Sequence, residues 1–147
     1  MHHLVTLAAT LAYTIDGPIN APVLVLSNSL GTDHTLWDKQ LPAFAARFRV
    51  LRYDARGHGQ SSVPAGPYRI ADLGRDVLAL LDALGLGRVH FCGLSMGGLG
   101  NGWPCTPRSA CTGWCFATRP PKSVPSRPGT PALTRYSAME WNPCTKP

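Results

Sequence analysis

Hydrophobic and polar residues in the first two thirds of the chain form strand-length apolar runs separated by stretches of helical spacing. The strand-like runs cover residues 5–7, 11–15, 22–27, 49–53 and 89–92. Residues 70–84 place apolar side chains on one face of a helix. A second helical pattern is interrupted at Pro42, which predicts a short or broken helix. Alternating strands and helices predict an α/β fold, with a mostly parallel sheet and crossover helices.

The last apolar run leads directly into Gly-Leu-Ser-Met-Gly-Gly at residues 93–98. A G-x-S-x-G sequence between a strand and a helix is typical of the nucleophile elbow of α/β-hydrolases. Such a turn exposes Ser95 on a strained backbone, and side chains at Gly93 and Gly97 would collide across it. We therefore predict Ser95 as a catalytic nucleophile and the backbone N–H of Met96 as an oxyanion donor. The alternative is a glycine-rich turn with an incidental serine.

Two loops after earlier strands agree with this interpretation. Residues 28–32 follow a strand that we expect to be buried on both faces, where this fold places its second oxyanion donor. We predict the backbone N–H of Leu30 for that role, although a plain strand-ending turn fits equally well. For residues 53–61 we favour a structural loop, with glycines at positive φ and Arg56 bonding neighbouring carbonyl groups.

No histidine follows Ser95 in the chain. In α/β-hydrolases the triad runs Ser, then Asp or Glu, then His. His34 could line the pocket and His58 belongs to a loop, and neither is favoured as a substitute base. We therefore expect that neither the acid nor the base of the triad is present in this chain.

These motifs, together with Leu36-Trp37, resemble the 3-oxoadipate enol-lactonases over about residues 4–99. The discriminating stretch is Ser-Asn-Ser-Leu-Gly-Thr at residues 27–32, where most related hydrolases place His-Gly. The resemblance implies a cofactor-free α/β-hydrolase of bacterial aromatic catabolism that opens a β-ketoadipate enol-lactone with water. It implies Ser95 as the nucleophile, Leu30 and Met96 as oxyanion donors, and no metal. The family's acid and base lie in a later segment that nothing here matches.

The segment 100–147 differs in composition from residues 1–99. It holds six Lys and Arg residues against one acidic residue, nine of the 14 prolines, four of the five cysteines and three of the four tryptophans. It shows neither a helical nor a strand period. We therefore expect residues 1–99 to be the N-terminal part of a hydrolase domain, and residues 100–147 to be an irregular, disordered tail.

A change of reading frame explains this tail. When the third base of each codon is joined to the first two bases of the next, Trp103-Pro104 must yield alanine and Trp114-Cys115 must yield valine. Across residues 99–124 the shifted frame permits an amino-acid sequence with the pattern of a helix, a turn and a buried strand. This sequence resembles the one that follows the elbow in the enol-lactonases. We therefore predict a frameshifted and truncated hydrolase.

The basic residues of the tail are scattered among prolines, so we expect no nucleic-acid partner. We also expect no membrane span, because no stretch is long enough. Residues 4–12 could be a weak signal peptide, but the lone Cys92 of residues 1–99 favours the cytoplasm. We expect no metal site at the tail cysteines, since they lack a C-x-x-C pair.

Two other functions stay open. The first is a different esterase, or a cofactor-free perhydrolase, of the same fold. The second is a noncatalytic binding module whose basic, cysteine-rich arm binds a metal or an acidic partner. A small-molecule lactone or ester is the expected substrate, and the sequence leaves the oligomeric state open.

Overall fold

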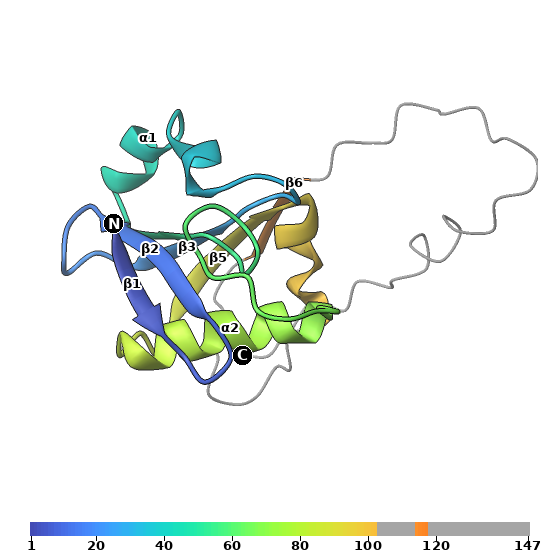
Figure 1. The fold of residues 1–147 in the computed structure, drawn as a ribbon. Coiled ribbons are helices and arrows are strands. Elements are labelled where there is room, and N and C mark those ends of the chain that lie inside the picture. Colours follow the sequence, from blue (N-terminus) through green and yellow to red (C-terminus); the bar gives the residue numbers. More distant parts are fainter. Residues whose placement is uncertain (103–113, 118–147) are drawn as a thin grey trace, which may run out of the picture.

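The computed structural model describes residues 1–102 and 114–117 of the 147-residue chain. In this part a six-stranded mixed sheet lies between helical layers (Figure 1). The strands are β1 (His2–Val5), β2 (Thr10–Asp16), β3 (Val23–Ser27), β4 (Arg49–Tyr53), β5 (Val89–Leu94) and β6 (Trp114–Ala117). The helical segments are η1 (His34–Trp37), α1 (Leu41–Ala45), α2 (Ile70–Ala83) and η2 (Ser95–Gly102).

The strand order is β1-β2-β4-β3-β5-β6. β1 and β2 form an antiparallel hairpin at one edge, and β4, β3, β5 and β6 run parallel to one another. Ser27 at the end of β3 is the register partner of Gly93 near the end of β5. The loops that leave these two strands therefore start side by side, and the predicted α/β fold is confirmed.

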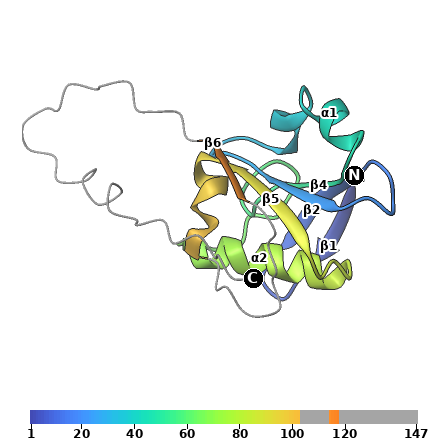
Figure 2. The same cartoon turned by 180° about the vertical axis from the view of Figure 1, so that it is seen from behind.

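The sheet has a separate apolar core on each face. Along β3, Val25 packs with the α2 residues Val77 and Leu80. Its neighbour Leu26 points the other way and packs with Trp37 of η1. This alternation follows from the two-residue period of a strand. Figures 1 and 2 show α2 on one side of the sheet and the η1–α1 segment on the other.

Most predicted elements lie within two residues of their observed bounds. The first strand is the exception, because it covers His2–Val5 and not residues 5–7. The Thr6 hydroxyl donates a hydrogen bond to the Ala9 carbonyl and accepts one from the Ala9 N–H, which closes a tight turn at the predicted strand. The broken helix at Pro42 is confirmed, since η1 and α1 are separate and Pro42 lies in the first turn of α1.

The strand β6 differs from the expectation that residues 100–147 are irregular. Its four residues, Trp-Cys-Phe-Ala, pair in parallel with β5, with Trp114 opposite Phe91. A short apolar segment satisfies the unpaired backbone groups that β5 would otherwise leave at the edge of the sheet. The remaining expectations for residues 103–113 and 118–147 lie outside the described residues.

Candidate functional site

Ser95 lies at the sharp turn between β5 and η2, and its side chain is exposed. Its φ of 52° makes it the one non-glycine residue with positive φ among those described. A Cβ atom on Gly93 would lie 2.3 Å from the Gly97 carbonyl oxygen, and one on Gly97 would lie 2.4 Å from the Ser27 carbonyl oxygen. Both contacts are far too short, so these positions accept only glycine. The predicted strained, exposed serine turn is confirmed.

The two predicted oxyanion donors lie on adjacent segments. Leu30 belongs to the turn that follows Ser27, and Met96 follows Ser95. The close approach of Gly97 to the Ser27 backbone places the start of η2 against the end of β3. The Leu30 side chain is exposed. The role of both N–H groups stays a prediction.

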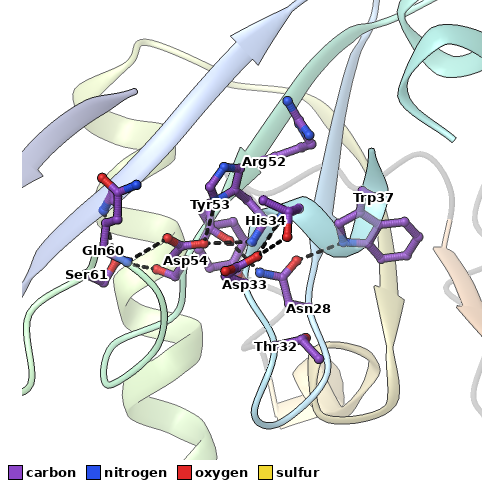
Figure 3. Close-up of polar contacts among 12 residues, drawn as sticks. Asn28, Thr32, Asp33, His34, Trp37, Arg52, Tyr53, Asp54, Gln60 and Ser61 are labelled. Carbon is purple, nitrogen blue, oxygen red and sulfur yellow. Dashed lines mark hydrogen bonds and ion pairs between the residues drawn. The ribbon is translucent and has the colours of Figure 1, made fainter. Parts of the chain in front are cut away.

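Asn28 fixes the start of the turn that carries Leu30 (Figure 3). Its buried side-chain amide donates a 3.0 Å hydrogen bond to the Tyr53 carbonyl oxygen. Its amide oxygen accepts a 2.8 Å hydrogen bond from the Trp37 indole N–H. Asn28 therefore joins β3, β4 and η1 at the edge of the sheet beside the elbow. Sequence reasoning missed this role, although an asparagine directly after a buried strand is a usable signal.

Asp54 and His34 form a second contact between loops at this edge (Figure 3). Oδ1 of the fully buried Asp54 accepts a 2.7 Å hydrogen bond from the His34 backbone N–H and lies 3.0 Å from His34 Nδ1. Its other oxygen accepts a 2.9 Å hydrogen bond from the Gln60 N–H. Asp33 and Thr35, not His34, line the surface pocket between this loop and residues 57–59. His34 is thus held by Asp54, and the expectation that it lines a substrate pocket stays a prediction.

The prediction for the Arg56 side chain was wrong. Its guanidinium does not bond neighbouring carbonyl groups but donates two 2.6 Å hydrogen bonds to the buried carboxylate of Asp76 on α2. This carboxylate raises the pKa of Arg56. The Tyr68 ring lies 5.7 Å from the guanidinium carbon. His58 Nδ1 lies 3.1 Å from the Arg56 carbonyl oxygen, which fits the structural role favoured for that loop.

A small apolar pocket lies between α2 and the elbow. Its walls include Leu73, Val77 and Met96, and its polar groups include the hydroxyls of Ser27 and Tyr53. These two hydroxyls are 2.7 Å apart and buried. Burial raises the pKa of the Tyr53 phenol to about 12, so this phenol is neutral at physiological pH.

In the part of the chain that the structure describes, no three His, Cys, Asp or Glu residues are grouped as they would be to bind a metal ion. Within the same residues, no helix is both long enough and apolar enough to cross a membrane. The side chains of Cys105, Cys111, Cys115 and Cys144 lie outside what the structure describes.

Comparison with known proteins identifies the family. The model of the alpha/beta hydrolase fold family matches residues 22–100. The chain is 53% identical over 94 residues to 3-oxoadipate enol-lactonase 1 of Acinetobacter baylyi, a match that covers 64% of this chain and 35% of the relative.

Solved structures give the same result. A hydrolase from Pseudomonas aeruginosa PA01 superposes with a TM-score of 0.70 at 56% identity, over 74% of this chain and 42% of that one. The enol-lactonase from Burkholderia xenovorans LB400 superposes with a TM-score of 0.66 at 53% identity, over 67% and 39% of the two chains. The chain thus spans about a third of the length of the curated relatives that it matches.

Proposed function

The chain belongs to the alpha/beta hydrolase fold family, and from this we propose that it is the N-terminal part of a serine hydrolase that opens a small lactone. The observation that carries the proposal is the exposed Ser95 at positive φ, between two positions that accept only glycine. The names of the similar proteins support an enol-lactone of the 3-oxoadipate type as substrate.

In the proposed reaction the Ser95 hydroxyl oxygen attacks the lactone carbonyl carbon and the ring C–O bond breaks. The backbone N–H groups of Leu30 and Met96 bind the oxyanion of the tetrahedral intermediate. Water then hydrolyses the acyl-enzyme and restores the Ser95 hydroxyl. Neither step needs a cofactor.

Both steps need a base, and we propose that it lies outside this chain. No histidine follows Ser95, and His34 is hydrogen-bonded to the buried Asp54. Removal of a triad lowers kcat by about a millionfold in other serine hydrolases. We therefore expect the 147-residue chain to have almost no turnover.

The test compares the purified 147-residue chain with a full-length relative on 3-oxoadipate enol-lactone and on simple esters. We expect hydrolysis by this chain at the level of its Ser95→Ala variant on both substrates. A rate within tenfold of the full-length relative, abolished in Ser95→Ala, would show that this chain already contains a competent base. Faster cleavage of the esters than of the lactone would favour a general esterase or a perhydrolase.

We further propose that the protein acts in the cytoplasm. Cys92 is the lone cysteine among residues 1–99, and such sparse use of cysteine fits a reducing compartment.

A further inference from the structure

The strand β6 continues the parallel sheet within a segment whose composition is foreign to the rest of the chain. It pairs with β5 over four register positions, from Phe91 opposite Trp114 to Leu94 opposite Ala117. A parallel α/β sheet adds its next strand at this place, after a crossover from the previous strand. A segment of unrelated origin has no reason to supply that strand.

The genetic code explains how a segment translated in the wrong frame can still supply β6. Tryptophan is encoded by TGG, and the codons for cysteine and phenylalanine begin with TG and TT. Joining the third base of each codon to the first two of the next makes Gly113-Trp114 encode Leu, Met or Val, and Trp114-Cys115 encode Val. Cys115-Phe116 then encodes Leu or Phe. The first three of the four β6 positions are therefore apolar in both frames, whichever synonymous codons are present, while Phe116-Ala117 encodes Cys or Arg in the shifted frame. The shifted frame also adds a β-branched residue, valine, that favours a strand.

The same rule accounts for the unusual residues of the tail. Every cysteine and tryptophan codon begins with TG, so each of these residues after position 99 becomes Leu, Met or Val in the shifted frame. Every proline codon begins with CC, so each proline becomes Ser, Pro, Thr or Ala. A tail rich in Cys, Trp and Pro is thus what an ordinary apolar sequence becomes when it is translated one base out of register.

The pocket behind the elbow points to what the other frame contributes. It is lined by apolar side chains of α2 and by Met96. Met96 lies four residues before Gly100, where the composition of the chain changes. Protein interiors are close-packed, so apolar walls of this kind beside a core are normally covered by further apolar side chains. In the shifted frame Gly102-Trp103 and Pro104-Cys105 each encode Leu, Met or Val, on either side of the alanine forced at Trp103-Pro104.

We propose that the coding sequence as written lacks one base that the gene contains near the codons for residues 98–100, and that residues 100–147 are the out-of-frame product of this omission. The restored chain continues from the elbow with apolar residues that fill the pocket against α2, and it then forms β6 with the shifted residues. This inference goes beyond the proposed function, because it places the acid and base of the triad in the restored reading frame.

Sequencing genomic DNA across the codons for residues 96–104, together with peptide mass spectrometry of the source cells, tests the proposal. We expect one additional base and tryptic peptides of the restored frame. Trypsin acting on the chain as written would release Ser109–Lys122, because it cuts after Arg108 and Lys122 but not between Arg119 and Pro120. DNA that matches the written sequence, with this peptide present in cells, overturns the proposal.

A second experiment separates this inference from the proposed function. The gene with the additional base is expressed beside its Ser95→Ala variant, and both proteins are assayed on 3-oxoadipate enol-lactone. We expect turnover that the variant lacks, and cooperative thermal unfolding of both proteins. If genomic DNA contains the additional base but the restored protein hydrolyses neither lactones nor esters, the frame inference stands and the proposed function fails.

Discussion

Asp54 holds His34 at two points, the backbone N–H and the ring Nδ1, through a single carboxylate oxygen. Its second oxygen accepts a hydrogen bond from the Gln60 N–H. Asp54 directly follows β4, so one buried carboxylate joins the end of that strand to the loop after residue 32 and to the loop before residue 61. Both loops are thereby fixed at the edge of the sheet that carries the elbow.

Replacing this carboxylate should destabilise the protein strongly. In Asp54→Ala the backbone N–H groups of His34 and Gln60 lose their bond to a carboxylate, and a hydrogen bond to a charged group contributes about 1.5–3 kcal/mol. We expect the free energy of unfolding, measured with urea, to fall by about 3 kcal/mol or more. The control is Asp82→Ala, at an exposed position of α2, which should change it by at most about 0.5 kcal/mol. Equal effects of the two substitutions would argue against Asp54 as a structural link.

The buried pair of Arg56 and Asp76 should show strong coupling. Removing one partner leaves the other charge buried and unpaired, at a cost of about 3–5 kcal/mol. We expect Arg56→Met and Asp76→Leu each to lower the free energy of unfolding by that order, and the double variant to lose clearly less than their sum. Urea unfolding of the four proteins in this cycle gives the coupling energy. Additive losses would mean that the two side chains act independently.

The sequence predicts the sheet and the elbow because these depend on local pattern. The period of apolar residues predicts β3, β4 and α2, and the glycines around Ser95 predict a turn that needs positive φ. Both signals are contained in a few consecutive residues, so they can be found without knowledge of tertiary contacts.

The polar contacts that support the site could not be predicted in the same way. Arg56 and Asp76 are far apart in sequence, and they meet because α2 crosses over the loop after β4. Asp54 is paired with His34 from a different loop. Contacts of this kind depend on the packing of elements and not on a period. β6 was missed for another reason, since its four apolar residues are too few to produce a recognisable pattern.

Asp72 should contribute to the acid stability of α2. The backbone N–H of Arg69 donates a 2.8 Å hydrogen bond to this carboxylate, and the Arg75 guanidinium contacts it. These contacts, the first most strongly, lower the pKa of Asp72 below 3.8. The folded state therefore gains stability from Asp72 above pH 3.8 and loses it as the pH falls through the lower folded-state pKa.

We expect Asp72→Asn to flatten the decline of stability below pH 3.8, measured by urea unfolding at a series of acid pH values. Asp82→Asn, on the same helix, is the matched control for the change of net charge. A decline of unchanged steepness in Asp72→Asn would show that the Arg69 hydrogen bond does not favour the ionised carboxylate.

Tyr53 should produce a loss of stability at alkaline pH. Burial raises its pKa from 10.0 to about 12, so the unfolded chain releases this proton at a lower pH than the folded protein. Stability from the neutral phenol is complete below pH 10.0 and is lost as the pH rises towards about 12. We expect tyrosinate absorbance to show one late-ionising group that is absent in Tyr53→Phe. The variant should also lose less stability over this pH range, and an identical alkaline decline would contradict the assignment.

The glycines of the elbow should tolerate no side chain, for a reason that a set of alanine variants can isolate. In Gly97→Ala the new Cβ meets the Ser27 carbonyl oxygen at 2.4 Å, and relieving such a contact costs about 1–3 kcal/mol or more. A Cβ atom on Gly85 would have nothing within 4 Å, but the φ of this residue is +66°, so Gly85→Ala tests backbone strain alone. Gly87 has open space and no positive φ, so Gly87→Ala should be neutral or stabilise by about 0.4–1 kcal/mol.

Urea unfolding should therefore rank these variants, with Gly97→Ala the least stable, Gly85→Ala intermediate and Gly87→Ala at least as stable as the parent. The ranking separates steric collision from backbone strain, because a Cβ atom on Gly97 collides with the Ser27 backbone, whereas a side chain on Gly85 is strained only by its positive φ. If Gly97→Ala were as stable as Gly87→Ala, η2 would have to move away from the end of β3. The segments that carry Leu30 and Met96 would then no longer be fixed to one another by this contact, and the proposed oxyanion site would lose its structural basis.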